Sequence, residues 1–178
     1  MGFLTGKTAI ITGGGRAVLS DGSCGSIGYG IATAYAKEGV NLVITGRNVK
    51  KLEDAKEELE RLYGIKVLPV QADVSAGADN EATVQNVVKQ AIDTFGRIDV
   101  LINNAQASAS GVTIADHTTD QFNLAMYSGV YAVFYYMQAL CGANINEKVL
   151  DICSRIWYSI KAVSERQAQN RKVWVRTD

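Results

Sequence analysis

Histidine and cysteine are what this sequence has least of, and each shortage excludes a class of chemistry. The single histidine, His117, excludes a metal site built from several histidines, and a Ser-His-Asp triad would have to use that one residue. The three cysteines, Cys24, Cys141 and Cys153, never stand as C-x-x-C, which argues against a zinc ribbon or a disulfide framework. We therefore expect no metal, free thiols and a reducing, cytoplasmic setting.

The chain also lacks net charge and long hydrophobic runs. Its 18 Lys and Arg side chains balance 18 Asp and Glu side chains, so we expect no binding to nucleic acid or to an anionic membrane. No apolar run approaches the roughly 18 residues that a membrane span needs, and the start of the chain lacks the basic segment of a secretory signal. The 178 residues, 47% hydrophobic and 20% charged, are typical of one soluble globular domain.

Short apolar runs rich in β-branched residues alternate with stretches of helical periodicity. Four runs of strand length stand at 8–12, 41–45, 66–71 and 100–103. Between them, apolar residues recur every three or four positions at 27–35, 52–63 and 84–95. Glycines that can end these helices stand at Gly39, Gly64 and Gly96. Strand and helix in repetition predict a doubly wound α/β fold, a Rossmann-type parallel sheet of about five strands with helices on both faces.

The helix expected over 119–140 differs from the others, because apolar residues surround it almost completely between Phe122 and Met137. Such a helix is either fully buried or part of a subunit interface, so association into a homo-oligomer is expected through it. After residue 140 the composition changes. We assign 1–140 to the nucleotide-binding domain and 141–178 to an atypical tail that completes or caps it, with a strand expected at 149–153 and a polar helix at 159–172.

A glycine-rich turn follows the first expected strand. Gly13-Gly14-Gly15 ends that strand, and Gly25-Ser26-Ile27-Gly28 opens the next helix. Glycines at such a turn let the backbone approach a pyrophosphate, whose charge is stabilised by the free N–H groups of the helix start. Because a strand precedes the turn and a helix follows it, the pattern indicates dinucleotide binding rather than a structural turn alone.

The residues after the second expected strand bear on the choice of cofactor. Sites for NAD place a carboxylate there to bind the ribose 2′-hydroxyl, whereas this sequence has Thr45-Gly46-Arg47. A guanidinium can bind a 2′-phosphate through two hydrogen bonds. The alternative is that Arg47 is a solvated residue at a helix start. The pattern favours NADP(H).

Three short motifs give the chain its likeness to a known family: Thr12-Gly13 with Ser26-Ile27-Gly28, Asp73-Val74 after the third expected strand, and Asn103-Asn104-Ala105 after the fourth. Over about residues 3–138 the sequence resembles the short-chain dehydrogenase/reductase family. Segments 26–32 and 103–111 are similar to those of bacterial NADP-dependent 12α-hydroxysteroid dehydrogenases and 3-oxoacyl carrier-protein reductases. The resemblance implies an oxidoreductase that interconverts a secondary alcohol and a ketone with NADP(H).

The resemblance also implies a role for each matching residue. Gly13, Ser26, Ile27 and Gly28 would hold the pyrophosphate, and Arg47 would meet the 2′-phosphate. Asp73 and Val74 would border the adenine, while Asn104 and Ala105 would lie along the ribose next to the nicotinamide. Gln106 stands where the family usually has glycine.

The glycine-rich turn is longer than the compact turn of the family, because residues 16–24 are inserted between Gly13 and Gly28. Lengthening a loop costs little entropy, so the insertion is either a harmless surface excursion or a segment that brings Asp21 near the phosphates and weakens binding.

The family's catalytic residues are not found at their usual spacing. The chemistry needs a tyrosine as general acid/base, a lysine one helical turn later, and a serine that orients the substrate oxygen. Ser154 follows the expected fifth strand, but Gln167 and Arg171 stand where the tyrosine and lysine would be, and Tyr158 and Lys161 are too close together and too close to Ser154. Three alternatives remain: an active oxidoreductase, a nucleotide-binding module without catalysis, or a truncated, frame-shifted product.

Overall fold

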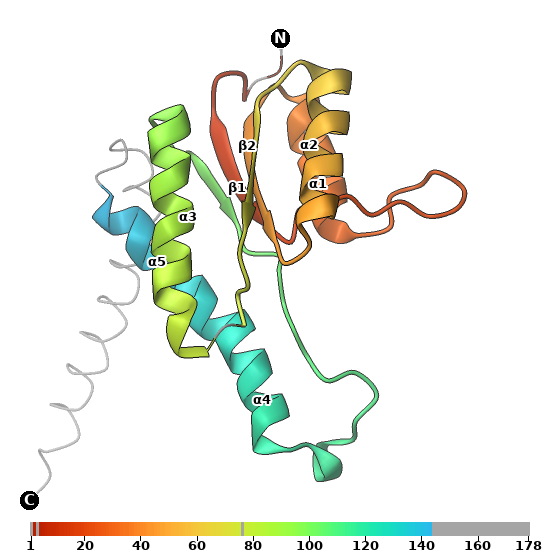
Figure 1. Cartoon of the computed structure of the whole chain (residues 1–178), viewed down its shortest axis with the longest axis vertical. Coiled ribbons are helices and arrows are strands. Elements are labelled where there is room, and N and C mark those ends of the chain that lie inside the picture. Colours follow the sequence, from red (N-terminus) through yellow and green to blue (C-terminus); the bar gives the residue numbers. More distant parts are fainter. Residues whose placement is uncertain (1, 3, 76, 144–178) are drawn as a thin grey trace, which may run out of the picture.

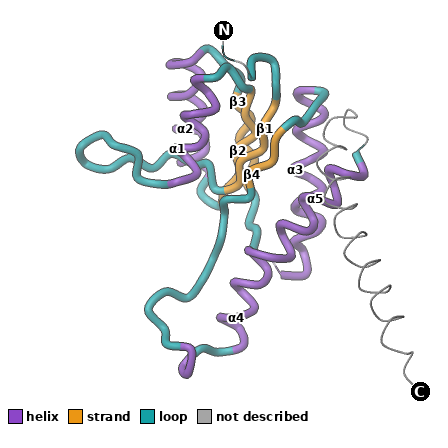
Figure 2. The backbone as a smooth tube through the Cα atoms, turned by 180° about the vertical axis from the view of Figure 1, so that it is seen from behind, coloured by secondary structure: helices purple, strands orange, loops and turns teal. Residues whose placement is uncertain are grey.

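The computed structural model describes residues 2, 4–75 and 77–143. Its sheet has four strands: β1 (Thr8–Thr12), β2 (Asn41–Gly46), β3 (Val67–Gln71) and β4 (Val100–Ile102). All neighbouring strands are parallel and lie in the order β3-β2-β1-β4. The four strands form one layer between two groups of helices (Figure 2). The chain therefore extends the sheet on one side of β1 and then crosses to its other side, which confirms the predicted doubly wound fold.

Helices cover both faces of the sheet (Figure 1). On one face lie α1 (Ile27–Lys37) and α2 (Val49–Tyr63), and on the other lie α3 (Asn80–Phe95) and α5 (Ala132–Gly142). Ile11 and Ile44 pack toward α1 and α2, whereas Ile10 and Val43 pack toward α3 and α5. All four side chains are fully buried, because successive side chains of a strand alternate between two faces that are both covered.

Local sequence signals set the ends of the helices. The side chains of Ser26 and Asn48 cap α1 and α2 by accepting hydrogen bonds from backbone N–H groups of the first turn. Gly64 and Gly96 end α2 and α3 in the left-handed conformation, with φ of 66° and 69°. Strand bounds differ from prediction by one residue: β2 continues to Gly46, β3 begins at Val67 and β4 ends at Ile102, because these are the residues that pair with a neighbouring strand.

The helix predicted over 119–140 consists of three consecutive pieces. α4 (Thr119–Met126) leads into a π-helical turn at Tyr127–Tyr131, and α5 follows directly. Full burial of this helix, one of the two expectations, is wrong: Phe122 and Phe134 expose 56% and 52% of their surface. The second expectation, a subunit interface, stays a prediction.

No helix in the described part of the chain is both long enough and apolar enough to cross a membrane. The expected strand at 149–153 and the expected helix at 159–172 lie outside the described residues.

Candidate functional site

The carboxyl ends of all four strands open into one cavity of about 280 Å³. Its walls come from the segments that follow the strands, namely Gly13, 45–47, 72–75 and 104–107. The helices that follow β1 and β4 lie on opposite faces of the sheet, although the two strands are neighbours. The cavity therefore lies at the topological switch point, where doubly wound sheets bind their ligands.

The structure brings most of the predicted site residues together. Six of the nine line the cavity: Gly13, Arg47, Asp73, Val74, Asn104 and Ala105. The other three, Ser26, Ile27 and Gly28, do not line it but begin α1 beside it. A Cβ atom on Gly28 would lie only 2.1 Å from the carbonyl oxygen of Gly13, so this approach of the helix to the end of β1 requires glycine.

Thr12 joins the ends of β1 and β4. Its hydroxyl oxygen accepts hydrogen bonds from the backbone N–H groups of Asn104 and Ala105, both at 2.9 Å. The side-chain amide of Asn104 donates in return to the carbonyl oxygen of Thr12 at 2.8 Å. Because Thr12 is only 2% exposed, water cannot easily replace these bonds, and they fix two walls of the cavity relative to each other.

Arg47 and Asp73 place opposite charges on the same side of the cavity. Arg47 is exposed and forms no ion pair within the described part of the chain. Asp73 accepts hydrogen bonds from the N–H and the hydroxyl of Ser75, at 2.9 and 2.6 Å. Partial burial raises the pKa of Asp73, but the bonds from Ser75 and the charge of Arg47 together lower it below its ordinary value. Asp73 is therefore ionised at neutral pH.

The π-helical turn between α4 and α5 holds the loops on two sides of the cavity. The hydroxyl of Ser128 accepts a hydrogen bond from the N–H of Ala107 at 2.9 Å. The fully buried amide of Asn80 donates to the carbonyl oxygens of Val74 at 2.7 Å and of Tyr127 at 2.9 Å. Since Val74 and Ala107 both line the cavity, this one turn positions both walls.

Sequence reasoning missed Ser75, Asn80 and Ser128. Asp73 and Ser75 form a local turn in which an aspartate accepts from the residue two positions later, a pattern that could have been found in the sequence. The bond from Asn80 to Tyr127 spans 47 positions and the bond from Ala107 to Ser128 spans 21, so no local pattern announces them.

The insertion at 16–24 forms a small hairpin that projects away from the sheet (Figure 1). Val18 and Cys24 pair across it as an antiparallel bridge. Asp21 accepts hydrogen bonds from the N–H and the hydroxyl of Ser23, at 2.9 and 2.6 Å, and does not line the cavity. The geometry thus favours a surface excursion, and the effect of the hairpin on binding stays a prediction.

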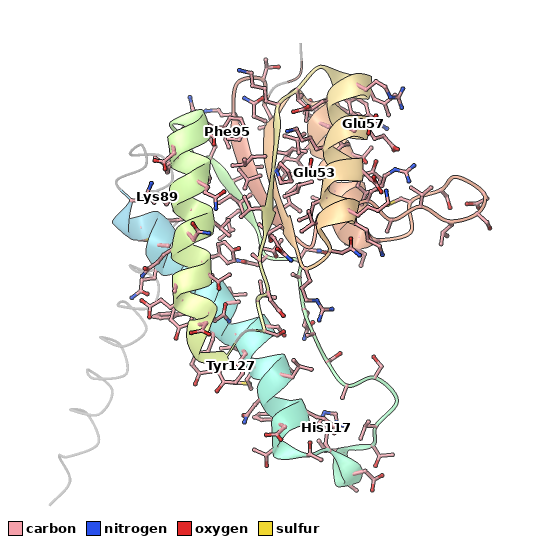
Figure 3. The ribbon with its side chains drawn as sticks, viewed as in Figure 1. Glu53, Glu57, Lys89, Phe95, His117 and Tyr127 are labelled. Atoms are coloured by element: carbon pink, nitrogen blue, oxygen red, sulfur yellow. The ribbon has the colours of Figure 1, made fainter. Side chains whose placement is uncertain are left out.

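His117 lies just before α4, away from the sheet (Figure 3), and does not line the cavity. Among the described residues, the His, Cys, Asp and Glu side chains form no group of three or more that could hold a metal ion.

Comparison with known proteins gives one family and a range of relatives. A family model described as short chain dehydrogenase matches residues 7–155. The chain is 62% identical over 138 residues to a 12α-hydroxysteroid dehydrogenase of a Clostridium species, a match that covers 78% of this chain and 51% of that protein. It is 31% identical over 145 residues to the BbsD subunit of (2S)-[(R)-hydroxy(phenyl)methyl]succinyl-CoA dehydrogenase of Thauera aromatica, covering 80% and 56%. The chain spans about half the length of the curated relatives it matches.

Solved structures show the same fold. L-sorbose reductase from Gluconobacter frateurii, complexed with NADPH and L-sorbose, is similar with a TM-score of 0.66 at 29% identity, over 78% of this chain and 48% of that one. A blue fluorescent protein from a metagenomic library, in complex with NADPH, has a TM-score of 0.66 at 30% identity, over 80% and 52%.

Replacing Thr12 by valine should lower the free energy of unfolding by about 2–4 kcal/mol, because two N–H groups lose their acceptor in a buried place. Thr12→Ser keeps the hydroxyl and should cost only about 1 kcal/mol, the value of the lost methyl group. Urea denaturation followed by circular dichroism measures both. Equal losses in the two variants would show that the hydroxyl is not the group that joins the strands.

Proposed function

The chain belongs to the short chain dehydrogenase family, and from that premise we propose that it binds NADP(H) at the ends of its strands as part of an oxidoreductase that interconverts a secondary alcohol and a ketone. The observation that carries this proposal is the cavity at the switch point, with the start of α1 on one side and on another Arg47, which forms no ion pair with any residue that the structure describes. When bound, the cofactor would supply or accept the hydride of that reaction.

The start of α1 fits a pyrophosphate. Ile27 and Gly28 are the first residues of α1, so their N–H groups have no acceptor inside the helix and are free to bind an anion. The partial positive charge of the helix N-terminus adds to this attraction. The side chain of Ile27 is 77% exposed, a position from which it can cover a bound dinucleotide.

The opposite part of the cavity fits the adenosine half of NADP(H). Arg47 would bind the 2′-phosphate, since it is exposed and is the one basic residue among the described residues that line the cavity. Asp73 and Val74 would border the adenine. Asn104 and Ala105, held in place by Thr12, would lie along the ribose next to the nicotinamide.

A hydroxysteroid is the substrate class that we propose. The support is the identity of 62% with a 12α-hydroxysteroid dehydrogenase, about twice that of the Thauera aromatica relative.

Arg47→Asp should reduce the affinity for NADPH by about 10- to 150-fold and reverse or abolish the preference over NADH, because a charge-assisted pair with the 2′-phosphate is lost and a repulsion is added. Fluorescence titration with each nucleotide measures both affinities. Lys66→Asp makes the same change of charge on an exposed residue just before β3, at the amino end of the strands, and should leave both affinities unchanged. Equal affinity of the unaltered chain for NADPH and NADH would contradict the proposed preference.

NADP(H) binding without hydride transfer is a second candidate function for this chain, and a sequence observation favours it: no Tyr-x-x-x-Lys stands anywhere in the 178 residues. General acid/base catalysis increases a rate by about 10²- to 10⁴-fold, so a chain that lacks it should show a rate lower by that factor. We expect no NADPH oxidation above background with a 12-oxosteroid. Sustained oxidation that disappears in Tyr158→Phe would contradict this expectation.

A second copy of the chain is the partner that we propose for the apolar side of the α4–α5 helix. Phe122, Val130, Tyr131 and Phe134 are 45–56% exposed there, which is unusual for a monomer. Light scattering should show a dimer or larger species, and Phe122→Gln with Phe134→Gln should shift it toward the monomer. Ile114→Gln, at an apolar residue 90% exposed outside this helix, is the control and should not. A monomeric unaltered chain that binds no hydrophobic dye would contradict the proposal.

A further inference from the structure

The carboxylate of Glu58 receives a hydrogen bond from each side of the inserted hairpin. Its Oε2 lies 2.5 Å from Nε of Arg16, which stands at the beginning of the insertion. Its Oε1 accepts from the hydroxyl of Tyr29 at 2.5 Å, and Tyr29 belongs to the first turn of α1, just after the insertion. One side chain of α2 therefore ties together the two ends of the lengthened glycine-rich turn.

The backbone of the turn rests on the same helix. The N–H of Arg16 donates to the carbonyl oxygen of Lys51 at 2.7 Å. Gly15 lies so close to α2 that a Cβ atom on it would be 3.2 Å from Cβ of Lys51. The helix begins directly after Arg47 and Asn48, so the helix that contacts the turn also starts next to the arginine that we assign to the 2′-phosphate.

At neutral pH the carboxylate of Glu58 is ionised and accepts hydrogen bonds, while the guanidinium of Arg16 and the hydroxyl of Tyr29 are protonated and donate them. The hydrogen bond from Tyr29, together with the guanidinium of Arg16, lowers the pKa of Glu58, although partial burial opposes them. Burial, and then the nearby carboxylate, raise the pKa of Tyr29, so its hydroxyl stays protonated and remains a donor. The side chains of Arg16 and Glu58 are 37% and 25% exposed, and Tyr29 is 4% exposed.

We infer that Glu58 is a positioning residue for the dinucleotide, which holds the glycine-rich turn and the start of α1 in the conformation that receives the pyrophosphate. The inserted hairpin gives the turn more conformations than a compact turn has, and binding would have to order them at a cost in affinity. The anchor at Glu58 removes this cost by ordering the two ends of the turn before the ligand arrives. The inference rests on the proposed binding of NADP(H).

Fluorescence titration of the full chain with NADPH tests the inference. Glu58→Gln keeps the shape of the side chain but loses the charge that pairs with Arg16, and its affinity should fall by about 2- to 30-fold. Glu57→Gln is the matched control, because it makes the same change on the exposed residue directly before Glu58 in α2 (Figure 3). This change should leave the NADPH affinity unaltered. Arg16→Met should weaken binding as Glu58→Gln does, and the double variant should be no weaker than either single variant, because the two side chains act as one unit.

Two further measurements separate positioning from a contribution to stability alone. Hydrogen exchange of the amides at 13–28 should be faster in ligand-free Glu58→Gln than in the unaltered chain, and NADPH should remove most of the difference. A lower melting temperature with unchanged NADPH affinity would overturn the inference. Should Glu58→Gln not fold, Tyr29→Phe removes one of the two hydrogen bonds without changing the charge, and unchanged affinity in that variant would overturn the inference equally.

The unaltered chain separates the two proposals. If it binds NADPH and Glu58→Gln binds as tightly, the positioning role is wrong and the proposed function stands. If the unaltered chain itself binds no NADPH, the proposed function fails and the inference fails with it.

Discussion

The close approach of Gly13, Gly28 and Asn104 is the constraint on which the site depends. A Cβ atom on Gly28 would lie 2.1 Å from the carbonyl oxygen of Gly13 and 2.6 Å from the amide nitrogen of Asn104, so there is no space for any side chain. This contact fixes where β1 ends, where α1 begins and how the loop after β4 leaves the sheet. The free N–H groups of α1 are therefore held at a fixed position relative to the walls of the cavity. A larger residue in place of either glycine would change that position.

A cavity at the ends of strands poses a second problem, because the loops that line it have left the hydrogen-bond ladder of the sheet. The loop backbone instead forms hydrogen bonds with three side chains that do not line the cavity, those of Thr12, Asn80 and Ser128. Side chains of this size satisfy the loop backbone and hold it in place without filling the cavity. Asn80 donates a hydrogen bond to the π-helical turn, and Ser128 belongs to that turn. Through these two side chains the turn holds the loop after β3 and the loop after β4 together.

The fold could be predicted from the sequence because its signals are local. Alternating apolar runs gave the four strands to within one residue, and Gly64 and Gly96 marked the ends of two helices. The irregular turn at Tyr127–Tyr131 could not be predicted, because apolar residues all round a helix carry no information about its hydrogen-bond pattern or about what covers it. Six of the nine predicted site residues share one cavity for a topological reason: the carboxyl ends of parallel strands meet at one edge. The anchor at Glu58 has partners 42 and 29 positions away, beyond the reach of any local pattern.

The insertion places two charged residues near the glycine-rich turn, and the structure engages both of them elsewhere. Arg16 is paired with Glu58, and Asp21 is bonded to Ser23 in the projecting hairpin. Neither of these charged side chains lines the cavity, and the effect of the insertion on binding at the start of α1 stays a prediction. Charge in the cavity comes instead from Arg47 and Asp73, and both hydrogen bonds from Ser75 go to one carboxylate oxygen of Asp73, Oδ1. Because Arg47 has no such partner in the described structure, its charge is available to a ligand, and the proposed preference for a 2′-phosphate depends on this one side chain.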